Sequence, residues 1–235
     1  MFSLLQIQAA SNDLAATAVT PEVIEQPTEY TLSILELATK GGWIMVVLAI
    51  LSVLAVYIFI ERFMVISRAT KYDMGFMERI REYMKDGKID SAQALCRGNS
   101  TPISRMIEKG LSRLGRPLND INSAIENVGN LEVSQLEKGV SILAMIASAA
   151  PMLGFLGTVT GMIRAFYNMS MAGNNIDIEL LSSGIYEAMV TTVGGLIVGI
   201  IAYIFHAILA NRIQKVVYLL EAKATEFMDV LNEPA

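Results

Sequence analysis

Long runs of apolar residues dominate the pattern along this chain. Three of them reach the roughly 20 residues that a helix needs to cross the hydrocarbon core of a bilayer. They run from Trp43 to Ile60, from Val140 to Phe166 and from Gly184 to Leu209. The pattern therefore predicts an all-α integral membrane protein with three transmembrane helices.

The segment between the first two runs also follows a helical period. Apolar residues recur at helical spacing from Met74 to Gly98, with interruptions at Gly87 and at Gly98 itself. Thr101 followed by Pro102 is typical of a helix start, with the threonine as N-cap.

Two helices are expected to extend beyond the membrane. No strong helix breaker occurs between Asn119 and Pro151, so we expect one helix from Asn119 to Met169, about 75 Å long. The third run continues with a helical period to Leu231. The sequence therefore predicts long helical extensions that form a basket on one side of the bilayer.

Composition supports a membrane protein and disfavours several kinds of chemistry. Hydrophobic residues make up 53% of the 235 positions and charged residues 17%, against roughly 25% charged in soluble domains. The net charge of −5 argues against a nucleic-acid partner. One cysteine, Cys96, and one histidine, His206, provide no disulfide framework and no His or Cys cluster. We expect no metal, no cofactor and no enzymatic activity, with Cys96 as an apolar filler and His206 at the membrane interface.

The distribution of lysine and arginine predicts the direction of the spans. The tail before Trp43 has one basic residue against five acidic ones, whereas twelve basic residues lie between Arg68 and Lys138. The connection between the second and third runs has none, and three follow the third run. By the positive-inside rule, the tail and the short connection lie outside, while the middle segment and the C-terminus lie inside.

The first residues leave two interpretations open. The stretch MFSLLQIQAASNDLAATA has a short apolar run followed by small residues, as at the end of a cleaved signal peptide. It lacks the positive residues that begin such a signal. The other interpretation is an exported tail that stays on the protein.

Small residues distinguish the second and third runs from the first, whose smooth apolar sequence suits contact with lipid. They are Ala147, Ala150, Gly154, Gly157 and Gly161 in the second run, and Thr191, Gly195, Gly199 and Ala202 in the third. Small side chains let membrane helices approach closely, so we expect these positions to pack helices together. Pro151 lacks an N–H and is expected to bend the second helix, as a fixed bend or a hinge.

Glu187 is the most informative residue of the third run. A charge at the centre of a membrane helix costs about 2.5–3.5 kcal/mol on insertion scales, so such a residue faces protein or water and predicts a functional site. Thr191 lies four residues on, and therefore on the same helix face, with Thr192 beside it. The alternative is a protonated Glu187 that hydrogen-bonds Tyr186 or Thr158 for structure alone.

One carboxylate makes a poor proton relay. If cations move past Glu187, we expect the second carboxylate to come from another chain. Arg164, near the outer end of the second run, either reaches the membrane interface or pairs with an acidic residue of a partner.

Two stretches of the sequence resemble the ExbB/TolQ/MotA family of proton-channel and stator proteins. They are LEKGVSILAMIASAAPMLGFLGTVTGMIRAF and GIYEAMVTTVGGLIVGIIAYIFHAIL. The matching features are Ala150-Pro151, Leu153-Gly154, Leu156-Gly157-Thr158-Val159, Gly161-Met162, Phe166, Gly184-Ile185, Glu187-Ala188 and Thr192. Glu61-Arg62 at the end of the first run also fits, and the resemblance covers residues 43–210.

The resemblance implies a homopentameric ring in a bacterial inner membrane, with the second and third spans around a central pore. A dimer of a single-span partner, ExbD-like or TolR-like, would sit inside and supply an aspartate. Proton flow would then drive a TonB-like or TolA-like protein. By position, Thr158 and Thr192 match the pore-facing threonines of the family and Glu187 its membrane glutamate. Thr191 joins this set because many relatives have one hydroxyl where this chain has two.

The family pattern and the charge distribution together divide the chain into seven segments. They are a periplasmic tail (1–42), three spans (43–63, 140–169 and 184–209), a cytoplasmic helical domain (64–139), a periplasmic loop (170–183) and a cytoplasmic C-terminal helix (210–235).

The function expected from the resemblance is that of an ExbB-like subunit. Such a subunit couples the proton motive force to a TonB-type protein for active transport across the outer membrane. A TolQ-like subunit of the Tol-Pal envelope-integrity motor is the alternative, whereas the MotA branch usually has four spans. In a third hypothesis, a passive membrane scaffold, Glu187→Ala leaves motive-force-dependent uptake intact.

Overall fold

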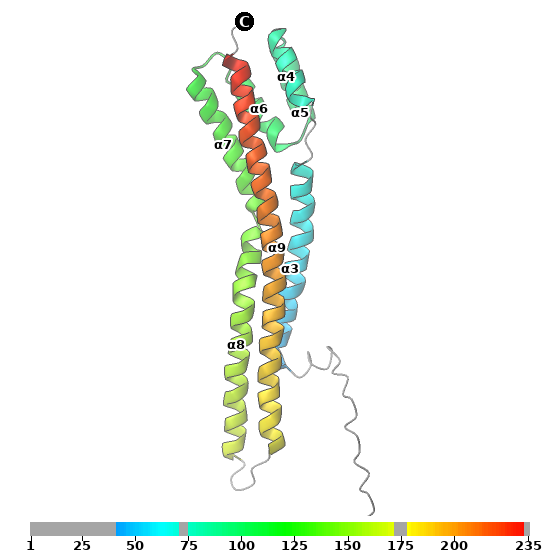
Figure 1. The fold of residues 1–235 in the computed structure, drawn as a ribbon, viewed down its shortest axis with the longest axis vertical. Coiled ribbons are helices and arrows are strands. Elements are labelled where there is room, and N and C mark those ends of the chain that lie inside the picture. The colour runs from blue at the N-terminus through cyan, green and yellow to red at the C-terminus, as the bar shows by residue number, and fades with distance from the viewer. Residues whose placement is uncertain (1–40, 71–74, 172–177, 233–235) are drawn as a thin grey trace, which may run out of the picture. The chain divides into compact units, whose positions relative to one another are not determined.

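The computed structural model describes residues 41–70, 75–171 and 178–232, which form seven α-helices and no β-strand (Figure 1). The helices are α3 (Gly42–Ala69), α4 (Phe76–Lys85), α5 (Ile89–Gly98), α6 (Pro102–Leu111), α7 (Leu118–Glu137), α8 (Val140–Met171) and α9 (Ile178–Asn232). The predicted all-α class is confirmed for these ranges. The N-terminal tail, and with it the choice between a signal peptide and an exported tail, lies outside the described residues.

Three helices in the described ranges are long and apolar enough to cross a membrane. They are α3, α8 and the Leu181–Asn232 part of α9. α8 and α9 run antiparallel and side by side, and α3 packs against both of them (Figure 1). At 1.5 Å per residue the 28 residues of α3 are about 42 Å long. Its last turns therefore extend beyond a hydrocarbon core of about 30 Å.

α9 is continuous for 55 residues, which confirms the prediction that the third run continues as helix to Leu231. After Gly199 the sequence of α9 contains neither glycine nor proline. Buried residues recur at intervals of three, four and seven along this part, at Leu209, Ile213, Val216, Leu220 and Phe227. This spacing forms one apolar stripe, which packs on the neighbouring helices and holds the extension of α9 in place.

The single helix expected from Asn119 to Met169 is wrong. α7 ends at Glu137 and α8 begins at Val140, with Lys138 and Gly139 between them. Gly139 has φ +87°, a left-handed conformation that glycine adopts without steric cost. The break is made by this glycine and not by a proline. It ends α7 and redirects the chain into α8.

Gly139→Ala is expected to lower the free energy of unfolding by about 1–2 kcal/mol, because an L side chain is strained at positive φ. Its Cβ would also lie 3.1 Å from Nε of Arg62. Equilibrium unfolding of the purified protein in detergent micelles measures the change. Gly129→Ala is the matched control, because Gly129 lies within α7 and its nearest neighbour for a Cβ is Sδ of Met106 at 3.5 Å. Equal stability of the two variants would contradict a strained turn at Gly139.

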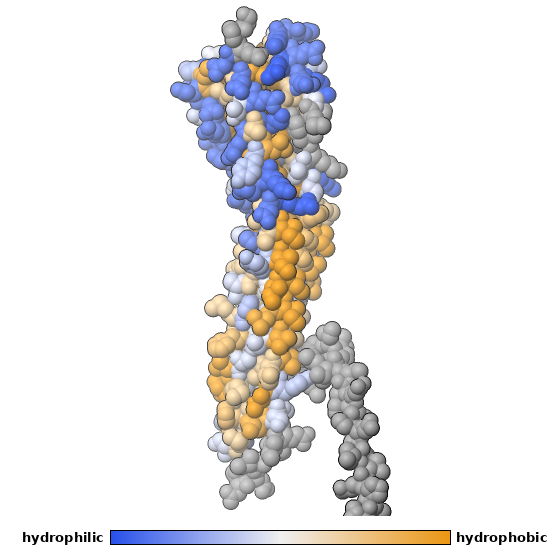
Figure 2. Space-filling model, in the orientation of Figure 1, coloured by the Kyte–Doolittle hydropathy of each residue, from blue (hydrophilic) through white to orange (hydrophobic). Residues whose placement is uncertain are grey.

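At the polar end of the molecule, helices α4 to α7 form a bundle with the second half of α9. Figure 2 shows hydrophilic residues gathered over this end and apolar residues over the lower part of the molecule in this view. Thr101 caps α6 as predicted, since its Oγ1 accepts a bond from the backbone N–H of Ser104, and Pro102 is the first helical residue. Cys96 is buried in this bundle as the expected apolar filler. Burial raises the pKa of its thiol to about 12, so the thiol stays protonated at neutral pH.

Candidate functional site

Small residues of α8 and α9 face each other along the whole contact between these two helices. On α8 they are Ala150, Gly154, Gly157, Gly161 and Ala165, and on α9 they are Gly184, Ala188, Thr191, Gly195 and Gly199. Both sets follow the same intervals of four, three, four and four residues. We call this antiparallel contact the glycine seam.

At its glycines the seam brings the two backbones closer than an added Cβ would allow. A Cβ on Gly195 would lie 2.6 Å from the carbonyl oxygen of Ala150 and 2.9 Å from Cα of Gly154. A Cβ on Gly161 would lie 3.0 Å from that of Ala188. In lipid, where packing replaces the hydrophobic effect between helices, such close approach is what holds a helix pair together.

Pro151 lies within α8 without ending the helix. Its ring packs on Gly199, where an added Cβ would be 2.6 Å from Cγ of the proline. The same Cβ would lie 3.2 Å from the carbonyl oxygen of Ala147, which is the group left without a helical N–H partner by the proline. Gly199 therefore leaves room for the proline ring and for this carbonyl.

The three predicted threonines lie at different depths in the seam. Thr191 is 1% exposed, and its hydroxyl donates to the carbonyl of Ala188 at 2.8 Å. Thr192 is half-buried, and its hydroxyl donates across the seam to the carbonyl of Gly154 at 3.3 Å. Thr158 donates to the carbonyl of Phe155 at 2.6 Å, and it lies one turn beyond Gly154 on the same face of α8. Thr158 and Thr192 thus share one edge of the seam, while Thr191 lies inside it.

Glu187 forms an ion pair with Arg164 across α8 and α9. Nη1 of Arg164 lies 3.1 Å from Oε1 and 3.4 Å from Oε2 of Glu187. The carboxylate also lies beside the start of α3, where a Cβ on Gly42 would be 2.5 Å from Oε1. The sequence left open an interfacial position or an acid of another chain for Arg164, and the structure provides the acid within the same chain. The sequence contained a sign of this pair, because the second apolar run has one basic residue, the third has one acidic residue, and the two helices are expected to run antiparallel.

The ion pair lies on one flank of the seam, and Thr158 and Thr192 lie on the opposite flank. Thr158 and Arg164 are six positions apart in the sequence, which places them roughly 120° apart around α8. Glu187 and Thr192 are five positions apart, which places them roughly 140° apart around α9. α3 covers the flank of the ion pair, since Gly42 lies at Glu187 and Met45 at Gly194. The structure therefore divides the predicted polar set into two groups.

No group of three or more His, Cys, Asp or Glu side chains in the described ranges is placed to hold a metal ion. His206 is half-buried in α9 and no hydrogen bond to its ring is found among the described contacts. The polar contacts of α8 and α9 in the described ranges include this ion pair, the threonine hydroxyls and the hydroxyl of Ser148, which donates to the carbonyl of Met145.

The part of the chain that contains α8 and most of α9 is similar in sequence to known proteins. Residues 99–222 match the model of the MotA/TolQ/ExbB proton channel family. The chain is 28% identical over 182 residues to an ExbB homolog of Methanothermobacter thermautotrophicus, which covers 77% of this chain and 64% of that protein. It is 29% identical over 174 residues to an ExbB-like protein of Synechocystis sp., covering 73% and 68%. It is 26% identical over 204 residues to the Tol-Pal system protein TolQ of Haemophilus influenzae, covering 82% and 89%.

Proposed function

Because this chain belongs to the MotA/TolQ/ExbB proton channel family, we propose that it is a subunit of an energy-transducing proton channel of the ExbB/TolQ type. The chain is a multi-pass protein of the inner membrane, as its three apolar helices and its family indicate. The family is one of transport proteins and not of enzymes. The observation that carries the proposal is the pair of hydroxyls, Thr158 and Thr192, at one edge of the glycine seam. These are the positions at which the resemblance places pore-facing threonines.

Within this family, the ExbB branch is the one we propose. The subunit would couple the proton motive force to a TonB-type protein and so drive transport across the outer membrane. The similarity to proteins named as ExbB homologs and ExbB-like proteins supports this branch. The TolQ branch is the second candidate, because the similarity to TolQ covers 89% of that protein. Co-purification with a TonB-like or with a TolA-like protein separates the two.

The working unit in this proposal is a homopentameric ring around a dimer of an ExbD-like or TolR-like single-span partner. The edge with Thr158 and Thr192 would face the partner, because α3 covers the other flank of the seam. α3 would face lipid, since Trp43, Val53 and Tyr57 are each more than 60% exposed on its surface. Native mass spectrometry of the purified full chain tests the number of copies in the ring.

The orientation in this proposal follows the basic residues. The tail and the connection between α8 and α9 would lie in the periplasm, and α4 to α7 with the end of α9 in the cytoplasm. The twelve basic residues between Arg68 and Lys138 support this direction.

The polar residues would take different roles. Thr158 and Thr192 would accept a hydrogen bond from the protonated carboxyl group of a partner, because a threonine oxygen that donates one bond still accepts another. Thr191 would act within the seam, since its side chain is buried between α8 and α9. A place for Glu187 in the proton pathway stays a prediction.

Thr158→Val and Thr192→Val are each expected to lower motive-force-dependent uptake roughly tenfold, since each removes a hydroxyl whose hydrogen bond contributes about 1–1.5 kcal/mol. Cells that lack their own copy of the subunit and express the variant provide the assay. Valine has nearly the shape of threonine, so the ring and its partner should assemble normally. Native mass spectrometry of the complex checks the assembly.

Thr160→Val is the matched control. Thr160 lies on the same helix, and its hydroxyl donates to the carbonyl of Leu156 at 2.9 Å, away from the edge shared by Thr158 and Thr192. We expect uptake close to that of the unmodified protein. Normal uptake in both Thr158→Val and Thr192→Val would refute the pore assignment.

A further inference from the structure

A cavity of about 450 Å³ opens where α3 passes beyond its apolar part. It lies between the last turns of α3, the start of α6 and the second half of α7. The polar groups that line it include Arg62, Arg68, Ser100, Thr101, Arg105 and Gln135. Its volume is that of a small-molecule site, and three arginines are among the residues that line it.

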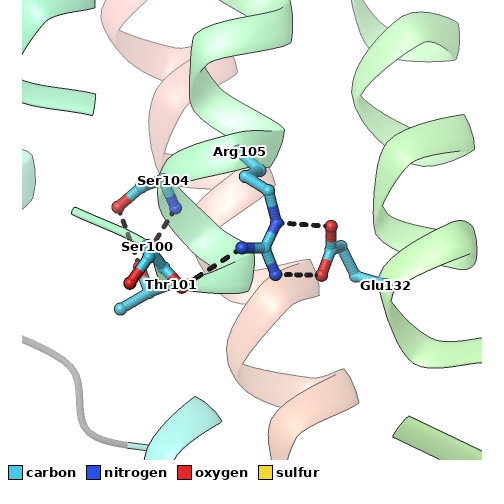
Figure 3. A network of polar contacts seen from close by, with 5 residues as sticks. All are labelled: Ser100, Thr101, Ser104, Arg105 and Glu132. Carbon is cyan, nitrogen blue, oxygen red and sulfur yellow. Dashed lines mark hydrogen bonds and ion pairs between the residues drawn. The ribbon is translucent and has the colours of Figure 1, made fainter. Parts of the chain in front are cut away.

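Arg105 is held in a fixed orientation at this cavity. Its Nε donates to Oε1 of Glu132 at 2.6 Å, its Nη2 donates to Oε2, and its Nη1 donates to the carbonyl of Ser100 at 3.2 Å (Figure 3). The Glu132 side chain is 7% exposed and the Arg105 side chain 45% exposed, so the carboxylate is sheltered while the arginine stays accessible from the solvent side. A guanidinium has five N–H donors, and three of those of Arg105 are used here. The other two are left for a ligand.

Arg62 and Arg68 bring further positive charge from α3. Arg62 donates to Oε1 of Glu61 at 3.3 Å, while its Nε is buried without a hydrogen-bond partner. Arg68 is exposed and forms no ion pair with any other described residue. Against three arginines the lining contains one carboxylate, that of Glu132. The cavity therefore keeps an excess of positive charge, which selects an anion.

The depth of the cavity in the membrane indicates the source of this anion. From Gly42 to Arg62 the helix rises about 30 Å, which is the thickness of the hydrocarbon core. Arg62 therefore lies at the level of the lipid headgroups. Ile60, Met64 and Val65 around it are exposed apolar side chains, and Val65 also lines the cavity. Such a surface suits an acyl chain next to a bound headgroup.

We propose that this cavity binds the phosphate of an anionic phospholipid, with the guanidinium groups of Arg62, Arg68 and Arg105 around the phosphate. Arginine matches phosphate geometry because its fork donates two parallel bonds. The acyl chains would lie along the exposed side of α3, next to Ile60 and Met64. The site goes beyond the proposed channel function and depends only on the insertion of α3 in the bilayer.

Native mass spectrometry of the purified full chain, with phosphatidylglycerol added in steps, tests the site. Arg68→Gln is the first variant, because Arg68 makes no ion pair in the described residues and its loss should leave the fold intact. A basic residue near an anionic lipid surface contributes about 1 kcal/mol. We therefore expect about fivefold weaker binding of phosphatidylglycerol in Arg68→Gln and a larger loss in Arg62→Gln/Arg68→Gln. Phosphatidylcholine should bind weakly to all of them.

Arg116→Gln is the control, since Arg116 is exposed, lies outside the cavity and has no ion pair in the described residues. It makes the same change of charge and should bind phosphatidylglycerol as the unmodified protein does. A photoreactive phosphatidylglycerol should label a peptide that lines the cavity in the unmodified protein. Equal binding by Arg68→Gln and the unmodified protein would overturn the proposal. So would inorganic phosphate that competes as well as the lipid, or a cross-link that shows a second copy of the chain in the cavity.

Discussion

Glu187→Gln is expected to abolish motive-force-dependent uptake and also to destabilise the protein. Glutamine has the shape of glutamate, so no cavity forms, but Arg164 loses its counter-charge. Breaking an ion pair from one side leaves a charge that the apolar surroundings do not stabilise. Because Arg164 is 56% exposed and near the end of its helix, we expect a loss of only about 2 kcal/mol. Equilibrium unfolding in detergent micelles measures this loss.

The double variant Arg164→Gln/Glu187→Gln separates the structural role of Glu187 from a role in transport. With neither charge present, stability should return close to that of the unmodified protein. Uptake should remain absent if the carboxylate takes part in proton transfer. If uptake returns together with stability, Glu187 serves only to neutralise Arg164, and its predicted place in the proton pathway is wrong.

The exposed ion pair of Arg97 and Glu108 provides the control for both measurements. Its atoms lie 2.9 Å apart on the polar bundle, and the arginine side chain is 69% exposed. Surface pairs of this kind contribute about 0–1 kcal/mol. Glu108→Gln should therefore change stability little and leave uptake unaffected. A loss of uptake in Glu108→Gln would show that the assay responds to any altered ion pair.

The sequence was sufficient for features that depend on local pattern. The length of the apolar runs predicts three helices able to cross a membrane, and the absence of glycine and proline after Gly199 is consistent with the uninterrupted second half of α9. The cap at Thr101 follows from a threonine before a proline. Each of these features is determined by a few neighbouring residues, so no knowledge of the tertiary structure is needed.

Features that depend on two helices together were not predictable in the same way. The sequence shows small residues in both runs, but only the antiparallel packing places Ala188 opposite Gly161. The same packing separates Thr191 from Thr192, because one position points into the seam and the next lies at its edge. The ion pair of Arg164 and Glu187 joins residues 23 positions apart, and it forms only once the two helices lie side by side.

Gly195→Ala is expected to destabilise the packing of the membrane helices strongly. The added carbon would lie 2.6 Å from the carbonyl oxygen of Ala150 and 2.9 Å from Cα of Gly154. Both neighbours are backbone atoms of α8, so neither can turn aside, and the two helices must separate. Overpacking of this kind costs about 1–3 kcal/mol, and we expect the upper end of that range.

Gly194→Ala is the matched control for Gly195→Ala. It makes the same substitution one position earlier in the same helix, and only the atoms around the added carbon differ. A Cβ on Gly194 would meet Sδ and Cε of Met45 at 3.0 and 3.3 Å, and these atoms end a flexible side chain that can move away. Alanine also favours a helix over glycine by about 1 kcal/mol, which offsets the contact. Gly194→Ala should therefore unfold at nearly the same detergent or denaturant concentration as the unmodified protein. If both variants lose the same stability, the close approach of α8 and α9 at Gly195 is not what holds the pair together, and helix contacts elsewhere must do so.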